Sequence, residues 1–332
     1  MLIGILIPCL NEAQIIQETI SVVLTKLDQN ILDGNEIVVI IVDDGSTDAT
    51  YDLAREAGAH ILYRHETNRG LGAATRSGME IAHYIGCDVV AKFDADLQHD
   101  IEDLLPAVRP LMRNECDILY ASRFSGKIHY KMPIIRKLGN LFFTKVMRIL
   151  TGWNITDAQT GLMCFSRRYL TIFEMPSTYN PPQQALFDAK KKGMRYGEVS
   201  AQFYPRKTGQ SFISLKYIYK VSSGLLKLSF YHHCFKFFAF IGIFLLALGG
   251  AIFLIGLVGF LRGLSDQYLP HGFAILILII SSVISVLLGL LSYAILSRQS
   301  VIRNFDRYLY IDIEKIYFNG VNSINSWRSK HV

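Results

Sequence analysis

The first half of the chain alternates short apolar runs with longer stretches in which apolar positions recur at a helical period. In order, these segments are residues 2–8, 12–27, 36–42, 47–57, 61–64, 70–85 and 89–93. The short runs predict buried strands, and the longer segments between them predict helices. Because helices that connect successive strands act as crossovers, we predict an α/β fold with a mainly parallel sheet covered on both faces.

Two long apolar runs dominate the second half. Residues 237–261 and 273–296 contain no Asp, Glu, Lys or Arg, and each exceeds the roughly 20 residues that cross a bilayer core. We therefore predict two transmembrane helices, joined as a hairpin by the short segment 262–272. Two buried helices of a soluble core are the alternative, which we disfavour because such helices normally carry a polar face.

Cations flank both apolar runs on the side away from the connecting loop. They are Lys216, Lys220, Lys227 and Lys236 before the first run, and Arg298, Arg303 and Arg307 after the second. The loop itself carries only Arg262. By the positive-inside rule, the N-terminal region and the tail should both be cytoplasmic. The formal net charge is +6, and its concentration near the runs favours contact with anionic lipid over a nucleic-acid partner.

A further helix is predicted for residues 134–150, with apolar side chains on one face and cations mostly elsewhere. A basic amphipathic helix of this kind can lie in a membrane interface, although an ordinary surface helix has the same pattern. We divide the chain into an α/β domain (1–211), a juxtamembrane helix (212–233), the hairpin (234–297) and a cytoplasmic tail (298–332). The tail should form a helix along the membrane, and we expect a homo-oligomer.

Polar side chains follow three of the predicted strands at the point where each ends. They are Asn11 and Glu12 after the first strand, Asp43 and Asp44 after the second, and Asp94, Asp96 and Gln98 after the fourth. Each group alone is explained equally well by a turn or a helix cap. Parallel strands bring their carboxyl ends to one edge, where α/β sheets bind ligands. Together the three groups therefore favour a binding site.

The last of these groups has the chemistry of a metal site. Asp94 and Asp96 present two carboxylates a few ångströms apart, and Gln98 adds an amide carbonyl. Oxygen donors of this kind suit Mg²⁺ or Mn²⁺, which often leave positions for water and substrate phosphates. The Asp-x-Asp pattern by itself is common by chance, so its weight comes from the surrounding motifs.

Those motifs, taken in order, resemble the family 2 glycosyltransferases. They are residues 7–12 (IPCLNE), 42–48 (VDDGSTD), 68–74 (NRGLGAA) and 94–99 (DADLQH), followed by 122–124 (SRF), 157–161 (DAQTG) and 206–211 (RKTGQS). Within that family the chain is most similar to the polyprenyl-phosphate glycosyltransferases, which include dolichol-phosphate mannose synthase. The resemblance extends over residues 1 to 215 and implies a GT-A-type domain that binds a nucleotide sugar, followed here by the two membrane helices.

The resemblance also implies roles for the polar residues at the strand ends. Pro8, Asn11 and Glu12 would line the base and ribose pocket, and Asp43 or Asp44 would accept a hydrogen bond from the base. Asp96 and Gln98 would hold the metal, with Asp94 contacting the metal or the ribose. A divalent ion there would neutralise the departing diphosphate.

The acceptor implied by the resemblance is a polyprenyl phosphate. Arg123, Arg136 and Arg206 are the candidates to bind its phosphate, since a guanidinium can donate two parallel hydrogen bonds to it. Taken singly, each is also an ordinary surface cation. Asp157 is a catalytic candidate together with Asp96, Arg123 and Arg206. It could orient the phosphate, bind the sugar or take a proton, or could simply shape a turn. A phosphate monoester, whose second pKa is about 6, needs positioning more than it needs a base.

The sequence therefore predicts a metal-dependent, inverting transfer of one sugar from a UDP- or GDP-sugar to undecaprenyl or dolichyl phosphate at the cytoplasmic face. A processive polysaccharide synthase is one alternative, but the chain has no Gln-x-x-Arg-Trp motif and only two spans. An inactive membrane scaffold is another. The segment 180–185 (NPPQQA) lacks an acidic residue that many relatives carry there, and the nearest carboxylate is Asp188. The sugar is therefore left open, as are the base and the lipid length.

Overall fold

The computed structural model describes residues 1–28, 35–175, 178–205, 215–262, 271–305, 312 and 315–319. The chain forms two compact units, which we describe separately. One unit combines Met1–Ile218 with Tyr308–Val332, and we call it the catalytic unit because it contains every described residue of the predicted site. The other, Tyr219–Arg307, contains the apolar hairpin.

The catalytic unit is built on an eight-stranded sheet in the order β7-β5-β6-β4-β1-β2-β3-β8. The strands are β1 (Leu2–Cys9), β2 (Glu36–Asp43), β3 (Ile61–Arg64), β4 (Val89–Lys92), β5 (Ile118–Ile128), β6 (Met163–Ser166), β7 (Tyr196–Phe203) and β8 (Tyr317–Phe318). The pairs β1/β2, β1/β4, β2/β3 and β5/β7 are parallel, whereas β6 and β8 run antiparallel to their neighbours. The predicted α/β fold with a mainly parallel sheet is confirmed.

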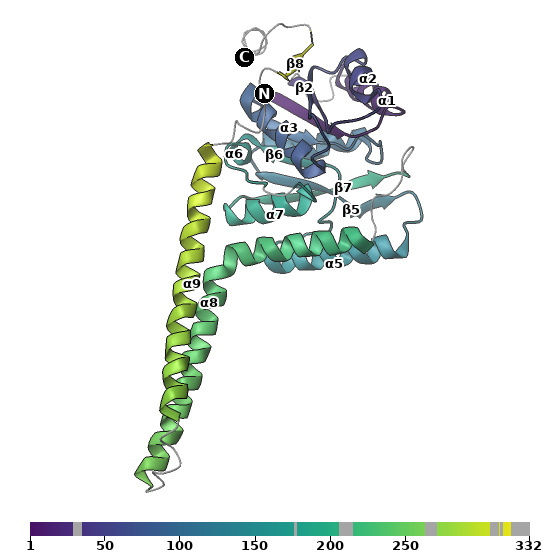
Figure 1. Ribbon diagram of the computed structural model, residues 1–332. Helices are drawn as coiled ribbons and strands as arrows, with labels where there is room; N and C mark the ends of the chain where they lie inside the picture. Colours follow the sequence, from purple (N-terminus) through teal and green to yellow (C-terminus); the bar gives the residue numbers. More distant parts are fainter. Residues whose placement is uncertain are drawn as a thin grey trace. The chain divides into compact units, whose positions relative to one another are not determined.

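Helices cover both faces of this sheet (Figure 1). They are α1 (Ile16–Asp28), α2 (Thr50–Glu56), α3 (Leu71–Ile85), the 3₁₀ turn η1 (Ile101–Asp103), α4 (Leu104–Met112), α5 (Ile134–Thr151), α6 (Arg167–Leu170) and α7 (Pro181–Lys191). Helices α1 and α4 share a core with alternate residues of β1. Helix α3 packs on the opposite face, where a Cβ at Gly78 would lie 2.0 Å from Leu6 Cδ1. A glycine there lets the helix approach the sheet closely.

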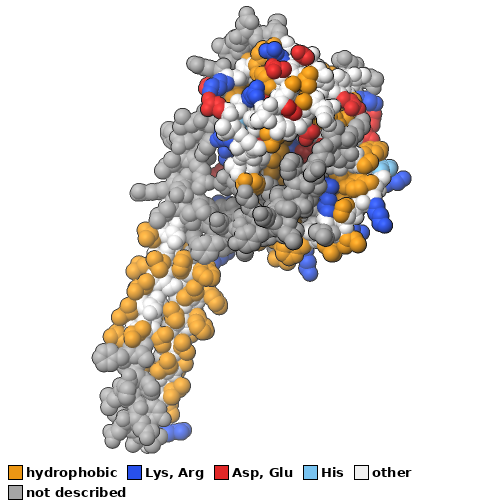
Figure 2. All heavy atoms as spheres, turned by 45° about the vertical axis from the view of Figure 1, so that its right-hand side comes forward, with side chains coloured by type: hydrophobic (Ala, Val, Ile, Leu, Met, Phe, Trp, Pro, Cys, Tyr) orange, Lys and Arg blue, Asp and Glu red, His pale blue; other side chains and the backbone are white. Residues whose placement is uncertain are grey.

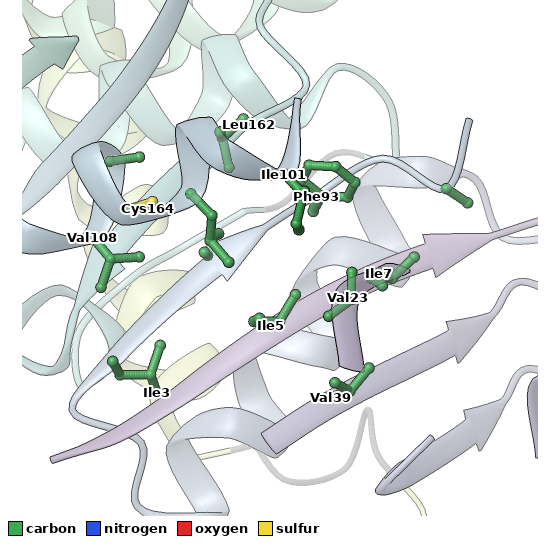
Figure 3. Close-up of a cluster of buried hydrophobic side chains, with 14 of the residues drawn as sticks. Ile3, Ile5, Ile7, Val23, Val39, Phe93, Ile101, Val108, Leu162 and Cys164 are labelled. Carbon is green, nitrogen blue, oxygen red and sulfur yellow. The ribbon is translucent and has the colours of Figure 1, made fainter. Parts of the chain in front are cut away.

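The period-two pattern of the strands explains where the core lies. Ile3, Ile5 and Ile7 point to one face of β1 and pack with Val23 of α1 and Val39 of β2 (Figure 3). Each of these side chains is fully buried, and burial of an aliphatic side chain of this size contributes roughly 1.5–3 kcal/mol. The apolar runs that predicted the strands therefore form the core that fixes the position of the strand ends.

Strand direction determines which residues meet at one edge. The parallel strands β1, β2, β4, β5 and β7 bring their carboxyl ends to the same edge of the sheet. Because β6 runs antiparallel to β4 and β5, its first residues lie at that edge too. The segment 157–161, which precedes β6, therefore arrives beside the residues that follow β4.

The second unit is a helical hairpin formed by α8 (Leu215–Leu261) and α9 (His271–Phe305). The two helices lie side by side (Figure 1), and Ser282 Oγ donates to the carbonyl of Gly242 at 2.8 Å. A Cβ at Gly242 would lie 2.9 Å from Val286 Cγ2. Small residues and serine hydrogen bonds of this kind are typical of helix contacts in membranes.

The hairpin has the length and surface expected of two membrane spans. Phe235–Gly259 and Ile275–Ser292 are long and apolar enough to cross a bilayer, and only 11% and 17% of these windows are buried. Their hydrophobic side chains lie at the surface of the described part of the hairpin (Figure 2). The soluble-core alternative required buried helices, so the exposure of these side chains argues against it.

The described part of the tail is not the single helix that we expected. Helix α9 continues to Phe305, but Tyr317 and Phe318 form strand β8, which pairs antiparallel with Leu62 and Ile61 of β3. Asn319 N donates to the carbonyl of His60 at 2.9 Å. The physical reason is that β3 would otherwise leave the backbone groups along its outer side unpaired. The tail segment therefore completes the sheet of the catalytic unit.

Candidate active site

The loops after β1 and β2 are tied to each other by hydrogen bonds. Asn11, at φ 54°, accepts a hydrogen bond from Thr47 N at 2.8 Å through Oδ1. Its own N–H donates to Ser46 Oγ at 2.9 Å, and Glu12 N donates to Thr50 Oγ1 at 2.8 Å. Pro8 is buried within β1. The predicted nucleotide-binding residues in and after β1 therefore lie at one edge of the sheet, where hydrogen bonds hold Asn11 and Glu12 to the loop after β2.

Asp43 and Asp44, at the end of β2, are both buried and hold neighbouring segments in place. Asp43 Oδ2 lies 3.1 Å from Arg64 Nε. Asp44 accepts from His65 Nδ1 at 2.6 Å, and from the N–H groups of Arg69 and Gly70 at 3.0 and 2.7 Å. Asp44 thus anchors the NRGLGAA segment to the sheet, a structural role that the sequence did not predict.

The turn after β4 contains a backbone conformation that is costly for a side chain of this type. Leu97 has φ 52°, in the left-handed region, which costs a non-glycine residue about 1–3 kcal/mol. Gln98 N donates to Asp96 Oδ1 at 3.1 Å, and Gln98 Nε2 donates to the carbonyl of Tyr204 at 3.3 Å. This turn therefore holds Asp96 and Gln98 close together beside the end of β7.

Lys92, the last residue of β4, is almost completely buried, with 1% of its surface exposed. Its ammonium forms an ion pair with Asp94 Oδ1 and donates to the carbonyl of Gly161 at 3.2 Å. A Cβ at Gly161 would lie 2.1 Å from Asp94 Oδ2. Only glycine at 161 allows the Asp94 carboxylate to occupy this position, so the DAQTG motif packs directly against the Asp-x-Asp motif.

His99 is a second group that joins these two motifs. Its Nε2 accepts from Gly161 N at 3.2 Å, while its Nδ1 has no hydrogen-bond partner among the described residues. Burial, followed by the nearby Arg123 charge, lowers the pKa of His99 to about 3. The ring is therefore neutral near pH 7, with its proton on Nδ1.

Arg123 and Asp157 form a buried ion pair with two parallel hydrogen bonds. Arg123 Nε lies 2.6 Å from Asp157 Oδ2, and Nη2 lies 2.8 Å from Oδ1. Asp157 also accepts from the N–H groups of Arg123 and Gln159, at 3.2 and 3.0 Å. Burial disfavours the ionised carboxylate, but Arg123 holds the pKa of Asp157 below its ordinary value. The carboxylate is therefore committed to protein donors.

The ring of Phe203, at the end of β7, joins two of the predicted phosphate-binding residues. The guanidinium carbons of Arg123 and Arg136 lie 5.1 and 6.0 Å from the ring centroid, and His99 packs against the ring at 5.0 Å. Arg136 also donates to Tyr130 Oη at 3.2 Å. The structure thus brings Arg123 and Arg136 together, whereas Arg206 lies outside the described residues.

We call the turn that contains Asp94, Asp96 and Gln98 the metal-type turn. Its oxygen donors fit a divalent ion that a substrate also helps to coordinate. No group of three or more His, Cys, Asp or Glu side chains that could hold a metal occurs among the residues described here. The set consists instead of the carboxylates of Asp94 and Asp96 with the amide of Gln98. Oxygen donors suit Mg²⁺ or Mn²⁺, and Mg²⁺ usually takes one or two carboxylates with substrate phosphates supplying the rest.

The segment that lacks the expected acidic residue begins α7. Gln183 is fully buried, and its Nε2 has no partner within the described part of the chain. Asp188 accepts from Tyr169 Oη and Glu174 N, both at 2.9 Å, and from Lys192 Nζ at 2.8 Å. Asp188 therefore anchors the end of α7 and does not replace the missing acid.

Sequence reasoning missed three residues of this site. Lys92 was detectable as a single charge at the end of an apolar strand, and His99 stands directly after Gln98. Phe203 gave no signal, because one aromatic residue in a strand is ordinary. The contacts that give these three residues their roles join distant segments, and only the structure shows them.

Comparison with known proteins agrees with the family resemblance. Residues 4–173 match the family described as glycosyl transferase family 2. The chain is 31% identical over 218 residues to UDP-N-acetylglucosamine–dolichyl-phosphate N-acetylglucosaminyltransferase of Methanococcus voltae, covering 60% of this chain and 84% of that protein. It is 28% identical over 228 residues to dolichol-phosphate mannosyltransferase of Pyrococcus furiosus, covering 66% and 61%. Dodecaprenyl-phosphate galacturonate synthase of Rhizobium johnstonii is 27% identical over 265 residues, covering 76% of each chain.

Solved structures share the fold at lower identity. Mannosyl-3-phosphoglycerate synthase from Rubrobacter xylanophilus aligns with a TM-score of 0.55 at 16% identity, covering 68% of this chain and 73% of that one. Glucosyl-3-phosphoglycerate synthase from Mycobacterium tuberculosis, in complex with Mn²⁺ and UDP-glucose, aligns with a TM-score of 0.51 at 22% identity, covering 68% and 78%. These matches confirm a GT-A-like α/β fold for the catalytic unit.

Proposed function

Because the chain belongs to glycosyl transferase family 2, we propose that it transfers a single hexose-type sugar from a nucleotide sugar to polyprenyl phosphate at a membrane surface. Relatives named for transfer to dolichyl or dodecaprenyl phosphate support this acceptor. The observation that carries the proposal is the meeting of Arg123 and Arg136 at one ring, beside the edge that holds Asp96 and Gln98. A cationic pair next to a metal-type turn suits two phosphorylated substrates.

The donor would bind along the ends of β1, β2 and β4. Asp96 and Gln98 would hold Mg²⁺ or Mn²⁺, and Asp94 would contact the ion or the ribose. When bound, such an ion stabilises the negative charge that develops on the departing diphosphate. Glu12 and the loop organised by Asp44 would face the base and ribose of a UDP- or GDP-sugar.

The acceptor phosphate would bind between the arginines. Nε and Nη2 of Arg123 hold Asp157 and the carbonyl of Gln159, but Nη1 has no hydrogen-bond partner among the described residues. Nη1 can therefore donate to a phosphate oxygen, with Arg136 supplying a second cation and Arg206 a third. Arginine suits this task because its fork stays charged and planar at all relevant pH values.

The reaction then requires alignment and no added base. An ionised phosphate oxygen attacks the anomeric carbon, the bond from that carbon to the diphosphate oxygen breaks, and the configuration inverts. Since the phosphate is already largely ionised near neutrality, no proton has to be removed. We therefore assign Asp157 the positioning of Arg123, because its oxygens are already occupied by four donors.

The membrane placement is supported by chain topology. The catalytic unit contains residues both before and after the hairpin, since β8 pairs with β3. A chain that leaves this unit and returns to it must cross the bilayer an even number of times, which agrees with two spans. The cations that flank the spans support the proposal that the catalytic unit and the tail lie on the cytoplasmic side.

Helix α5 supports contact between the catalytic unit and lipid. Ile134, Leu138, Phe142 and Ile149 have 75%, 61%, 58% and 74% of their surface exposed. Exposed large apolar side chains on a basic helix are typical of an interfacial helix. We propose that α5 lies in the cytoplasmic headgroup region, where a lipid-borne phosphate would reach Arg136 on the same helix.

The test is nucleotide release by purified full-length protein with Mn²⁺ and a panel of UDP- and GDP-sugars, with and without polyprenyl phosphate. We expect release with one donor that depends on the lipid, and loss of release in Asp96→Ala with the fold retained. Release without lipid dependence, or unchanged turnover in Asp96→Ala, would contradict the proposal. Polymeric product would indicate a processive synthase, and silence from folded protein would indicate a scaffold.

A further inference from the structure

The buried ammonium of Lys92 contacts the metal-type turn through the carboxylate of Asp94. Lysine is almost never fully buried unless it is paired, yet only 1% of Lys92 is exposed. It occupies the centre of the sheet, paired with Leu6 of β1 on one side and Met163 of β6 on the other. Its backbone is therefore fixed by two neighbouring strands.

The partner of this ammonium is fixed as well. Asp94 accepts from Lys92 through Oδ1, while Asp94 Oδ2 lies against Gly161, where a Cβ would come within 2.1 Å. Lys92 also donates to the carbonyl of Gly161. One carboxylate of the Asp-x-Asp motif is thus held in a charge-neutral pair with a buried ammonium, while 33% of the Asp94 side chain remains exposed.

We propose that Lys92 is a positioning residue that cancels the charge of Asp94, so that the site binds a divalent ion weakly until the nucleotide diphosphate arrives. The inference rests on the proposed function, because it concerns the same metal-type turn. The two carboxylates of Asp94 and Asp96 carry a charge of −2, and the ammonium of Lys92 reduces the net charge of the three groups to −1. The diphosphate then supplies the negative charge that a tight divalent site needs, and binding of ion and nucleotide is coupled.

The expected size follows from electrostatics at short range. A unit charge a few ångströms from a divalent ion changes its binding by roughly tenfold or more, even at the high effective dielectric near a protein surface. Removal of the Lys92 charge should therefore tighten binding of the free ion by at least that factor. Removal of the Asp94 charge should weaken it, because a buried cation is then left unpaired.

The experiment measures Mn²⁺ binding by electron paramagnetic resonance on the full chain in detergent, alone and with UDP or GDP. The variants are Lys92→Met, Asp94→Asn and the double variant, with Lys92→Arg as the charge-conserving control. We expect Mn²⁺ alone to bind about tenfold or more tighter to Lys92→Met and more weakly to Asp94→Asn. Lys92→Arg should bind Mn²⁺ nearly as the wild type does, and the double variant should bind Mn²⁺ more tightly than Asp94→Asn. The nucleotide should tighten binding more in the wild type than in Lys92→Met.

Unchanged or weaker Mn²⁺ binding in folded Lys92→Met would overturn the inference. If Lys92→Met does not fold, the double variant and Asp94→Asn decide, since the inference requires that Asp94→Asn be weaker than the double variant. Donor turnover by the wild type is measured separately. If the wild type turns over a donor but all variants bind Mn²⁺ equally, the inference is refuted and the proposed function stands. Absence of turnover with every donor counts against the function, while the Mn²⁺ comparison still tests the charge relation.

Discussion

Substitution of Asp157 separates a positioning role from a direct chemical one. Asp157→Asn keeps the shape of the side chain but removes its charge, leaving the guanidinium of Arg123, only 4% exposed, without its counter-ion. Loss of one partner of a buried ion pair typically costs about 3–5 kcal/mol. That is a large part of the roughly 5–15 kcal/mol that stabilises a typical domain.

The cost should appear as a lower unfolding temperature. For a domain of about 200 residues, each kcal/mol shifts the midpoint by roughly 2–4 °C, so Asp157→Asn should unfold about 6–20 °C below the wild type. Thermal unfolding of the purified protein in detergent, followed by circular dichroism, measures this. The apolar double variant Arg123→Met with Asp157→Leu should recover most of the stability, because replacing a buried pair with apolar side chains is often neutral or better.

Activity completes the comparison. The apolar double variant should remain inactive toward polyprenyl phosphate even though it is stable, because Nη1 of Arg123 is lost with the pair. A fully stable Asp157→Asn variant that has lost turnover would refute the positioning role and make Asp157 a direct participant. Turnover in the stable double variant would instead remove Arg123 from the acceptor site.

Three further predictions follow from the same edge of the sheet. Gly161→Ala should abolish turnover and lower the unfolding temperature, because its Cβ would displace Asp94 and leave the buried Lys92 ammonium without its counter-ion. Gly139→Ala, whose Cβ meets nothing within 4 Å, should behave as the wild type, and equal activities of the two variants would contradict this. Phe203→Leu should raise KM for polyprenyl phosphate about 5- to 30-fold, as expected from cation–π energies of roughly 1–2 kcal/mol, and leave KM for the donor unchanged. A change in both KM values would indicate general disruption. Burial raises the pKa of Asp103 from 3.8 to about 6, so the ionisation of this carboxyl destabilises the folded protein increasingly as pH rises through this interval. The thermal stability gained by Asp103→Asn should therefore grow from pH 4 to pH 6 and then stay constant, and a gain that is the same at pH 4 and pH 8 would exclude this explanation.

The strands of the sheet could be predicted from the sequence because the apolar runs that form them are local patterns. The apolar runs predicted β1 to β4 within a residue or two, and the shared direction of these strands placed Asp44 and Asp96 at one edge. The same reasoning could not supply contacts between distant segments. Arg123 meets Asp157 only because β6 runs antiparallel beside β5, and nothing in the sequence gives that register. The role of Asp157 was therefore left open between a substrate contact and a turn, because its pairing with Arg123 is invisible in the sequence.

The pairing of β8 with β3 also has a consequence for how the protein is made. The ribosome synthesises β8 after both apolar helices, so the outer side of Ile61–Arg64 stays unpaired while the hairpin enters the membrane. An open strand edge is a site for wrong pairing with other chains, and multi-part chains are exposed to this hazard while they fold. Insertion of the hairpin would therefore precede the last step of sheet assembly. A water-soluble version of the catalytic unit should need the segment 312–319 rejoined after residue 205, because a chain that simply stops before the hairpin would keep its sheet edge exposed.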